Sequence, residues 1–128
     1  MKASSSKKYI FAVGRRKTST ARVRLFKGVG ENLVNGIKII NSLIDKPFKT
    51  ANAIDKFYFT AKVVGGGKEG QIQAVVHGIA RALVKLDSEK FRIPLKKEGL
   101  LTRDSRERQR RMVGTGGKAR RKKQSPKR

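Results

Sequence analysis

The segment GRRKTSTARVR (14–24) combines the side-chain types that bind phosphate groups. Guanidinium, ammonium and hydroxyl groups follow one another closely, and this mixture of donors is typical of contacts to a nucleic-acid backbone. The alternative interpretation is an ordinary solvated strand face, which needs no ligand. We expect a cationic surface here, with phosphate contacts from Arg15, Arg16, Lys17, Thr18, Arg22 and Arg24.

Two glycine-rich segments resemble nucleotide-binding motifs but lack required residues. In GGGKEG (65–70), a phosphate loop would need Gly in place of Lys62 and Ser or Thr in place of Glu69. The segment is typical of a tight turn from a strand into a helix, although the amides that start the helix could still meet an RNA phosphate. GTGGKA (114–119) resembles a weakened dinucleotide fingerprint, but we expect no strand before it and no helix after it.

Catalytic and metal chemistry have no candidate residues in the sequence. The chain has no cysteine, one histidine (His77) and nine acidic residues that form no pair. His77 lies near the opposite side of its predicted helix from the apolar residues, so we expect it at the surface or facing RNA. We therefore expect no catalytic residue, no metal site, no cofactor and no enzyme activity.

The net charge restricts the partners that the chain can have. Lys and Arg total 33 against 9 Asp and Glu, giving a net charge of +24, which repels itself unless a polyanion neutralises it. Charge alone allows nucleic acid, an anionic membrane or an acidic protein, and it favours nucleic acid. The longest apolar runs are about five residues, far short of the ~20 that span a membrane. We expect no membrane partner and no homo-oligomer.

The distribution of charge divides the chain near residue 100. Residues 103–128 contain 12 basic and 2 acidic residues and no aromatic residue. A segment of this composition cannot build a packed core and is typical of a chain that becomes ordered on its partner. We predict a flexible leader (1–7), a globular body (8–102) and an extended basic tail (103–128).

Period-two alternation predicts the strands of the body. Ala21, Val23 and Leu25 alternate with polar residues, so one face of this strand is buried and the other carries arginines. The Asn35-Gly36 pair between apolar residues predicts a two-residue hairpin turn. The predicted strands are 9–13, 20–26, two strands within 32–39, and 56–64.

Helical spacing of apolar residues predicts one long helix over 68–86. Gly70, Ala74, Gly78 and Ala82 recur every four residues, which lets a neighbouring element pack closely against this helix. Each glycine costs ~1 kcal/mol of helix stability relative to alanine, so close packing is the expected compensation.

Two shorter helices are expected from weaker patterns. Residues 41–55 give an ambiguous pattern that Pro47 divides, with 46–55 as a candidate short helix. The other short helix is predicted over 88–99, where Pro94 would interrupt it. Strands followed by these helices predict an α/β (α+β) sandwich of two layers.

Four motifs resemble one family and cover nearly the whole chain. They are GRRKTSTARV (14–23), VVGGGKEGQIQAVVHGIARAL (63–83), LKKEGLLTRDSR (95–106), and GKARRKK (117–123) with a terminal Lys-Arg. In this order they resemble the small-subunit ribosomal protein S9 family, in its bacterial or organellar form. Three features depart from the family pattern: the segment 35–45 is shorter, the stretch 114–117 is one residue longer, and an aromatic residue is missing from the last five residues, QSPKR.

The resemblance implies a fold that periodicity does not predict. The family shares a left-handed β-α-β crossover with the second domain of ribosomal protein S5, whereas such crossovers are right-handed in about 98% of cases. It also implies a place in the head of the small ribosomal subunit, in contact with ribosomal RNA and neighbouring head proteins. The compartment would be the cytoplasm, or an organelle matrix.

The resemblance implies roles for the tail as well. The tail of the family threads through ribosomal RNA, and its end reaches the anticodon stem-loop of the transfer RNA in the P site. Lys127 and Arg128 would contact that transfer RNA. A nonspecific nucleic-acid-binding protein outside the ribosome is the alternative. The further residues expected on ribosomal RNA are Arg103, Arg106, Arg110, Arg111, Lys118, Arg120, Arg121, Lys122 and Lys123.

Overall fold

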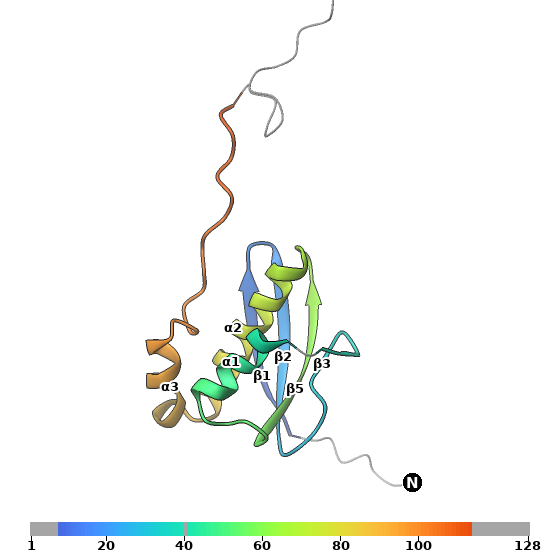
Figure 1. The fold of residues 1–128 in the computed structure, drawn as a ribbon, viewed down its shortest axis with the longest axis vertical. Coiled ribbons are helices and arrows are strands. Elements are labelled where there is room, and N and C mark those ends of the chain that lie inside the picture. The colour runs from blue at the N-terminus through green and yellow to red at the C-terminus, as the bar shows by residue number, and fades with distance from the viewer. Residues whose placement is uncertain (1–7, 40, 114–128) are drawn as a thin grey trace, which may run out of the picture.

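A five-stranded sheet forms one layer of the body (Figure 1). The computed structural model describes residues 8–39 and 41–113. The strand order is β1-β2-β5-β3-β4, with β3 and β5 parallel and all other neighbours antiparallel. The strands are β1 (Ile10–Arg16), β2 (Ser19–Lys27), β3 (Leu33–Val34), β4 (Ile37–Lys38) and β5 (Phe57–Val64).

Three helices form the second layer. The central helix, α2 (Lys68–Leu86), packs on β1, β2 and β5, while α1 (Ser42–Thr50) and α3 (Ser88–Lys97) pack against α2. The predicted two-layer α/β class is therefore confirmed. The parallel pair of β3 and β5 is joined through α1, and the left-handed sense of that crossover stays a prediction from the resemblance.

The buried faces of the strands follow the alternation in the sequence. Ala21, Val23 and Leu25 of β2 expose at most 2% of their surface, while Arg22 and Arg24 between them are exposed. In β5, Phe59, Ala61 and Val63 are buried against the helices in the same way. The strand and long-helix predictions are confirmed, and the bounds of α2 match the predicted 68–86.

Asn35 supports the short β3–β4 hairpin in two ways, through its backbone in the turn and through its side chain. Asn35 and Gly36 both have positive φ angles, 53° and 80°, as the predicted two-residue turn requires. The side-chain amide of Asn35 also accepts from the Val63 backbone N–H at 2.8 Å and donates to the Val63 carbonyl at 3.2 Å. These bonds continue the pairing with β5 beyond the end of a two-residue strand.

Pro47 and Pro94 lie inside continuous helices, so the prediction that they divide or interrupt their segments was wrong. Pro47 lies within α1 and Pro94 within α3. Each proline removes one helical hydrogen bond, but each helix is capped, by the side chain of Asn41 in α1 and of Asp87 in α3. Both helices also bury aromatic side chains in the core, Phe48 from α1 and Phe91 from α3. Capping and burial outweigh the single lost bond.

The row of small residues on α2 lies against the β1–β2 hairpin. A Cβ atom added to Gly14 of β1 would overlap the backbone of Ala74 and Gly78, and one added to Gly78 would lie 2.6 Å from a methyl of Val23. Gly70 faces the hydroxyl of Ser19 at the other end of this contact. The predicted close approach is confirmed, and its partner is the hairpin.

The glycines before α2 form the predicted turn from β5 into the helix. Gly65 and Gly66 have φ angles of 79° and 68°, a region that favours glycine. The buried hydroxyl of Ser19 donates to the Gly65 carbonyl at 3.0 Å, which holds this turn against the β1–β2 hairpin. The segment 65–67 therefore has a packing role.

Gly14→Ala is expected to lower the free energy of unfolding by about 3 kcal/mol, because the added methyl would displace the backbone of α2. Chemical denaturation measures the change. Gly67→Ala is the matched control, since its φ is −94° and an added Cβ would meet nothing within 4 Å. Equal stability of the two variants would contradict the packing argument.

Candidate nucleic-acid interface

The structure distributes the predicted cationic segment 14–24 over three places on the β1–β2 hairpin. Arg22 and Arg24 project from the face of β2 that no helix covers. Lys17 and Thr18 form the exposed hairpin turn, where Lys17 has a φ of 54°. The predicted single surface is therefore an open sheet face and a hairpin tip, and phosphate contacts from these residues stay a prediction.

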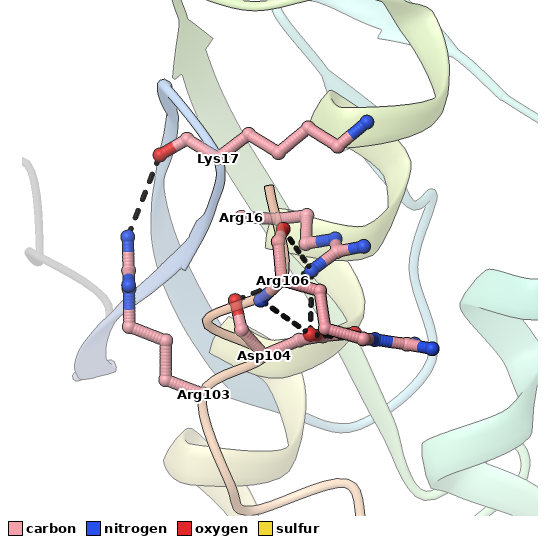
Figure 2. A network of polar contacts seen from close by, with 5 residues as sticks. All are labelled: Arg16, Lys17, Arg103, Asp104 and Arg106. Carbon is pink, nitrogen blue, oxygen red and sulfur yellow. Dashed lines mark hydrogen bonds and ion pairs between the residues drawn. The ribbon is translucent and has the colours of Figure 1, made fainter. Parts of the chain in front are cut away.

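The third part of the segment, Arg16, is directed into the protein. Its side chain exposes 11% of its surface and contacts the Asp104 carboxylate at 2.6 Å (Figure 2). One guanidinium nitrogen, Nη1, also donates to the backbone carbonyls of Asp104 at 3.3 Å and Arg106 at 3.0 Å. Arg16 thus holds the first residues of the tail against the hairpin.

Asp104 is the centre of this tail anchor, which we define as Arg16, Lys17, Arg103, Asp104 and Arg106 (Figure 2). The Arg106 side chain donates to both carboxylate oxygens of Asp104, at 2.7–3.1 Å, and its backbone N–H donates at 3.0 Å. These hydrogen bonds hold the pKa of Asp104 far below its usual range and raise that of Arg106. The carboxylate is therefore ionised at every physiological pH.

A further bond fixes where the tail leaves the body. Arg103 donates to the carbonyl of Lys17 in the hairpin turn at 3.4 Å. Beyond the anchor, residues 107–113 are exposed and form no helix or strand, and they run away from the body (Figure 1). Arg110 and Arg111 are among them. Seven further predicted contacts lie outside the described residues: Lys118, Arg120, Arg121, Lys122, Lys123, Lys127 and Arg128.

Three polar side chains of α2 cover the free edge of β1. They are spaced four residues apart on the helix, and they bond an edge-facing N–H or C=O group on every second residue of β1. Lys85 Nζ donates to the Phe11 carbonyl at 3.1 Å, and Arg81 Nη1 donates to the Val13 carbonyl at 2.6 Å. His77 Nδ1 accepts from the Arg15 N–H at 3.4 Å. Such bonds protect an edge strand against pairing with another chain.

His77 is half-buried and bonded within the protein, so it does not lie free at the surface as we expected, and contact with RNA stays a prediction. Because Nδ1 accepts from Arg15, the other ring nitrogen carries the proton and donates to the Leu101 carbonyl at 3.2 Å. The neutral ring thus joins β1 to the segment that leads into the tail. Its pKa is lowered from the usual 6.5, chiefly by burial and further by the positive charges of Arg81 and Arg103.

The structure offers neither a metal cluster nor a membrane-spanning helix among the residues that it describes. No three His, Cys, Asp or Glu side chains in 8–39 and 41–113 lie together as ligands. No described helix is both long and apolar enough to cross a bilayer. A cavity of about 340 Å³ lies beside the anchor and is lined by basic side chains such as Arg15 and Lys46, by apolar side chains and by Asp104.

Acidification is expected to destabilise the fold through His77. Below pH 6.5 the histidine of the unfolded chain takes up a proton, whereas burial keeps the folded ring neutral. The unfolded state therefore binds more protons, and the free energy of unfolding decreases as the pH is lowered. The urea midpoint should therefore fall between pH 7 and pH 5. His77→Gln, which cannot titrate, should flatten this dependence, and an equally steep dependence in that variant would contradict the assignment.

Asp104→Asn is expected to loosen the tail anchor, because the neutral amide cannot match the charge-assisted bonds to Arg16 and Arg106. Hydrogen exchange of the Arg106 amide should become faster, while exchange in the centre of α2 stays slow. Glu107→Gln removes an acid of the same segment that lies outside the anchor and serves as the control. Unchanged exchange in the Asp104 variant would show that the carboxylate does not order this segment.

Comparison with known proteins identifies the family. The sequence model of the family described as ribosomal protein S9/S16 matches residues 14–128. The small ribosomal subunit protein uS9 of Maridesulfovibrio salexigens is 43% identical over 120 residues, covering 88% of this chain and 92% of that protein. The uS9 of Desulfotalea psychrophila is 44% identical over 115 residues, covering 84% and 88% respectively.

The family model spans β2, the long helix α2, the tail anchor and the basic tail, because all of these lie within residues 14–128. The resemblance inferred from four motifs is thereby confirmed over most of the chain, and the chain belongs to the ribosomal protein S9/S16 family.

Proposed function

We propose that this chain is a structural, non-enzymatic constituent of the small ribosomal subunit and that it binds small-subunit ribosomal RNA. The observation that carries the proposal is family membership over residues 14–128. The cationic hairpin and the basic tail lie within that match and supply phosphate-binding groups. The proposed location is the ribosome, in the cytoplasm or in an organelle matrix.

The charge of the chain supports RNA as the partner. Each Lys or Arg that approaches a phosphate releases condensed counterions, which favours binding and makes it weaken with salt. A net charge of +24 on 128 residues makes this contribution large. The same charge would suit a nonspecific nucleic-acid-binding protein outside the ribosome, but that alternative gives no reason for the family match.

The anchored tail supports a reach beyond the body. Its 26 residues, 103–128, could span up to about 90 Å when fully extended, at ~3.5 Å per residue. We propose that the tail follows ribosomal RNA through Arg110 and Arg111 and then through the cations of 118–123. Its terminal cations, Lys127 and Arg128, would contact the anticodon stem-loop of P-site transfer RNA. Proteins of the subunit head would be the neighbours.

Small subunits reconstituted with the full chain or with residues 124–128 deleted test both parts of this proposal. Both chains should be incorporated equally, because the hairpin and most tail cations remain. Subunits with the truncated chain should release P-site transfer RNA faster, which filter binding measures. Failure of the full chain to enter the subunit would overturn the ribosomal role, whereas equal release rates would overturn only the transfer-RNA contact.

A further inference from the structure

Aromatic rings form a row across the sheet face that no helix covers. The ring centroids of Tyr9 and Phe26 are 5.8 Å apart, and those of Phe26 and Tyr58 are 5.0 Å apart with nearly parallel planes. Phe11 follows Tyr9 by two residues in the sequence, and it pairs with Arg24 of β2. Tyr9 and Phe11 expose 48% and 40% of their surface. Exposed rings on an open sheet face offer contact area to a partner.

Cations accompany these rings, and acids do not. Arg22 and Arg24 of β2 and Lys62 of β5 are exposed on the same face, and the Arg24 guanidinium lies 5.1 Å from the centre of the Tyr9 ring. None of the five described strands contains Asp or Glu. A hollow of about 700 Å³ lies on this face, lined by Phe11, Arg22, Arg24, Asn35, Gly36, Thr60, Ala61 and Lys62.

We propose that this open face stacks unpaired RNA bases on Phe11 and Tyr9, while Arg22, Arg24 and Lys62 contact the adjoining phosphates. Base stacking on aromatic side chains beside a cationic groove is the general mode by which proteins hold single-stranded nucleic acid. The inference rests on the proposed RNA-binding function. It adds a second mode of contact, through bases, to the phosphate contacts of the hairpin tip and tail.

The observations favour unpaired RNA over two other occupants. Duplex RNA offers its phosphates and sugars and keeps its base faces stacked inside, so it would use the cations and leave the rings unused. An acidic protein segment would also pair with the cations, but its other contacts would require only apolar surface and not the flat face of an aromatic ring. Replacing an aromatic ring with an aliphatic side chain of similar size therefore separates base stacking from both.

Phe11→Leu in the full chain tests the proposal with two probes, a labelled oligouridylate of about twelve nucleotides and an RNA duplex of matched length. Loss of one stack should weaken binding of the single strand about five-fold or more, and duplex binding should stay unchanged. The slope of affinity against salt should also stay unchanged, because the phosphate contacts remain. Phe11→Trp should restore the affinity.

Tyrosine emission gives a readout confined to this face. The chain has two tyrosines, Tyr9 and Tyr58, and no tryptophan, and both tyrosines belong to the row. In the wild-type protein, the single strand should quench this emission more strongly than the duplex does at equal saturation, with free tyrosine as the control for absorption by the bases.

Ile93→Ala is the matched control, because it removes an exposed apolar side chain from α3, away from the sheet face. The proposal would be overturned if Phe11→Leu bound the single strand with the same affinity as Ile93→Ala. It would also be overturned if the wild-type protein bound the single strand without quenching of its tyrosine emission. An equal loss of duplex affinity would also overturn it. Subunits that accept Phe11→Leu but lose a neighbouring protein would point to a protein occupant instead. Each of these outcomes leaves the ribosomal role standing, since that role is judged by incorporation.

Discussion

The contact between Gly14 of β1 and Gly78 of α2 is the constraint on which the rest of the arrangement depends. It brings the backbones of strand and helix so close that no Cβ atom fits between them. At this separation the side chains of His77, Arg81 and Lys85 reach the edge of β1 and bond its backbone. The helix layer is thereby fixed on one face of the hairpin, and the other face is left open.

The basic residues fall into two groups that perform different tasks. Arg16, Arg81, Lys85, Arg103 and Arg106 bond backbone carbonyls or Asp104 within the chain and so contribute to its architecture. Arg22, Arg24 and Lys62 project from the open face, where the strands offer no carboxylate to neutralise them. Cations of the second group add to a repulsion that only an external polyanion relieves. Bonds within the chain therefore already use part of the donor capacity of the first group.

Local patterns predicted most of the fold but little of the anchor. The bounds of α2, the buried residues of β2 and the Asn35-Gly36 turn follow from periodicity and turn chemistry, which act within a few residues. The bonds of Arg16 to Asp104 and of His77 to Arg15 join residues 88 and 62 positions apart, and no pattern in a single sequence specifies such pairs. The spacing of His77, Arg81 and Lys85 was a usable signal, because long polar side chains at every fourth position beside an edge strand can cap it. The continuity of α1 and α3 through proline depends on local caps, which the sequence offered at Asn41 and Asp87, and on tertiary burial, which local reasoning cannot reach.

The β1–β2 hairpin links the two surfaces that we assign to RNA. Its open face carries the aromatic row with Arg22 and Arg24, and its turn accepts the bond from Arg103 that sets the exit of the tail. The distance and direction between these surfaces are therefore set by the fold before any partner arrives. Ordering a flexible segment on binding has an entropic cost, and a fixed starting point reduces the part of that cost that falls on the first residues of the tail. On this argument, the bonds of Asp104 to Arg16 and Arg106 would lower that cost at the base of the tail, while its own charge would repel a phosphate.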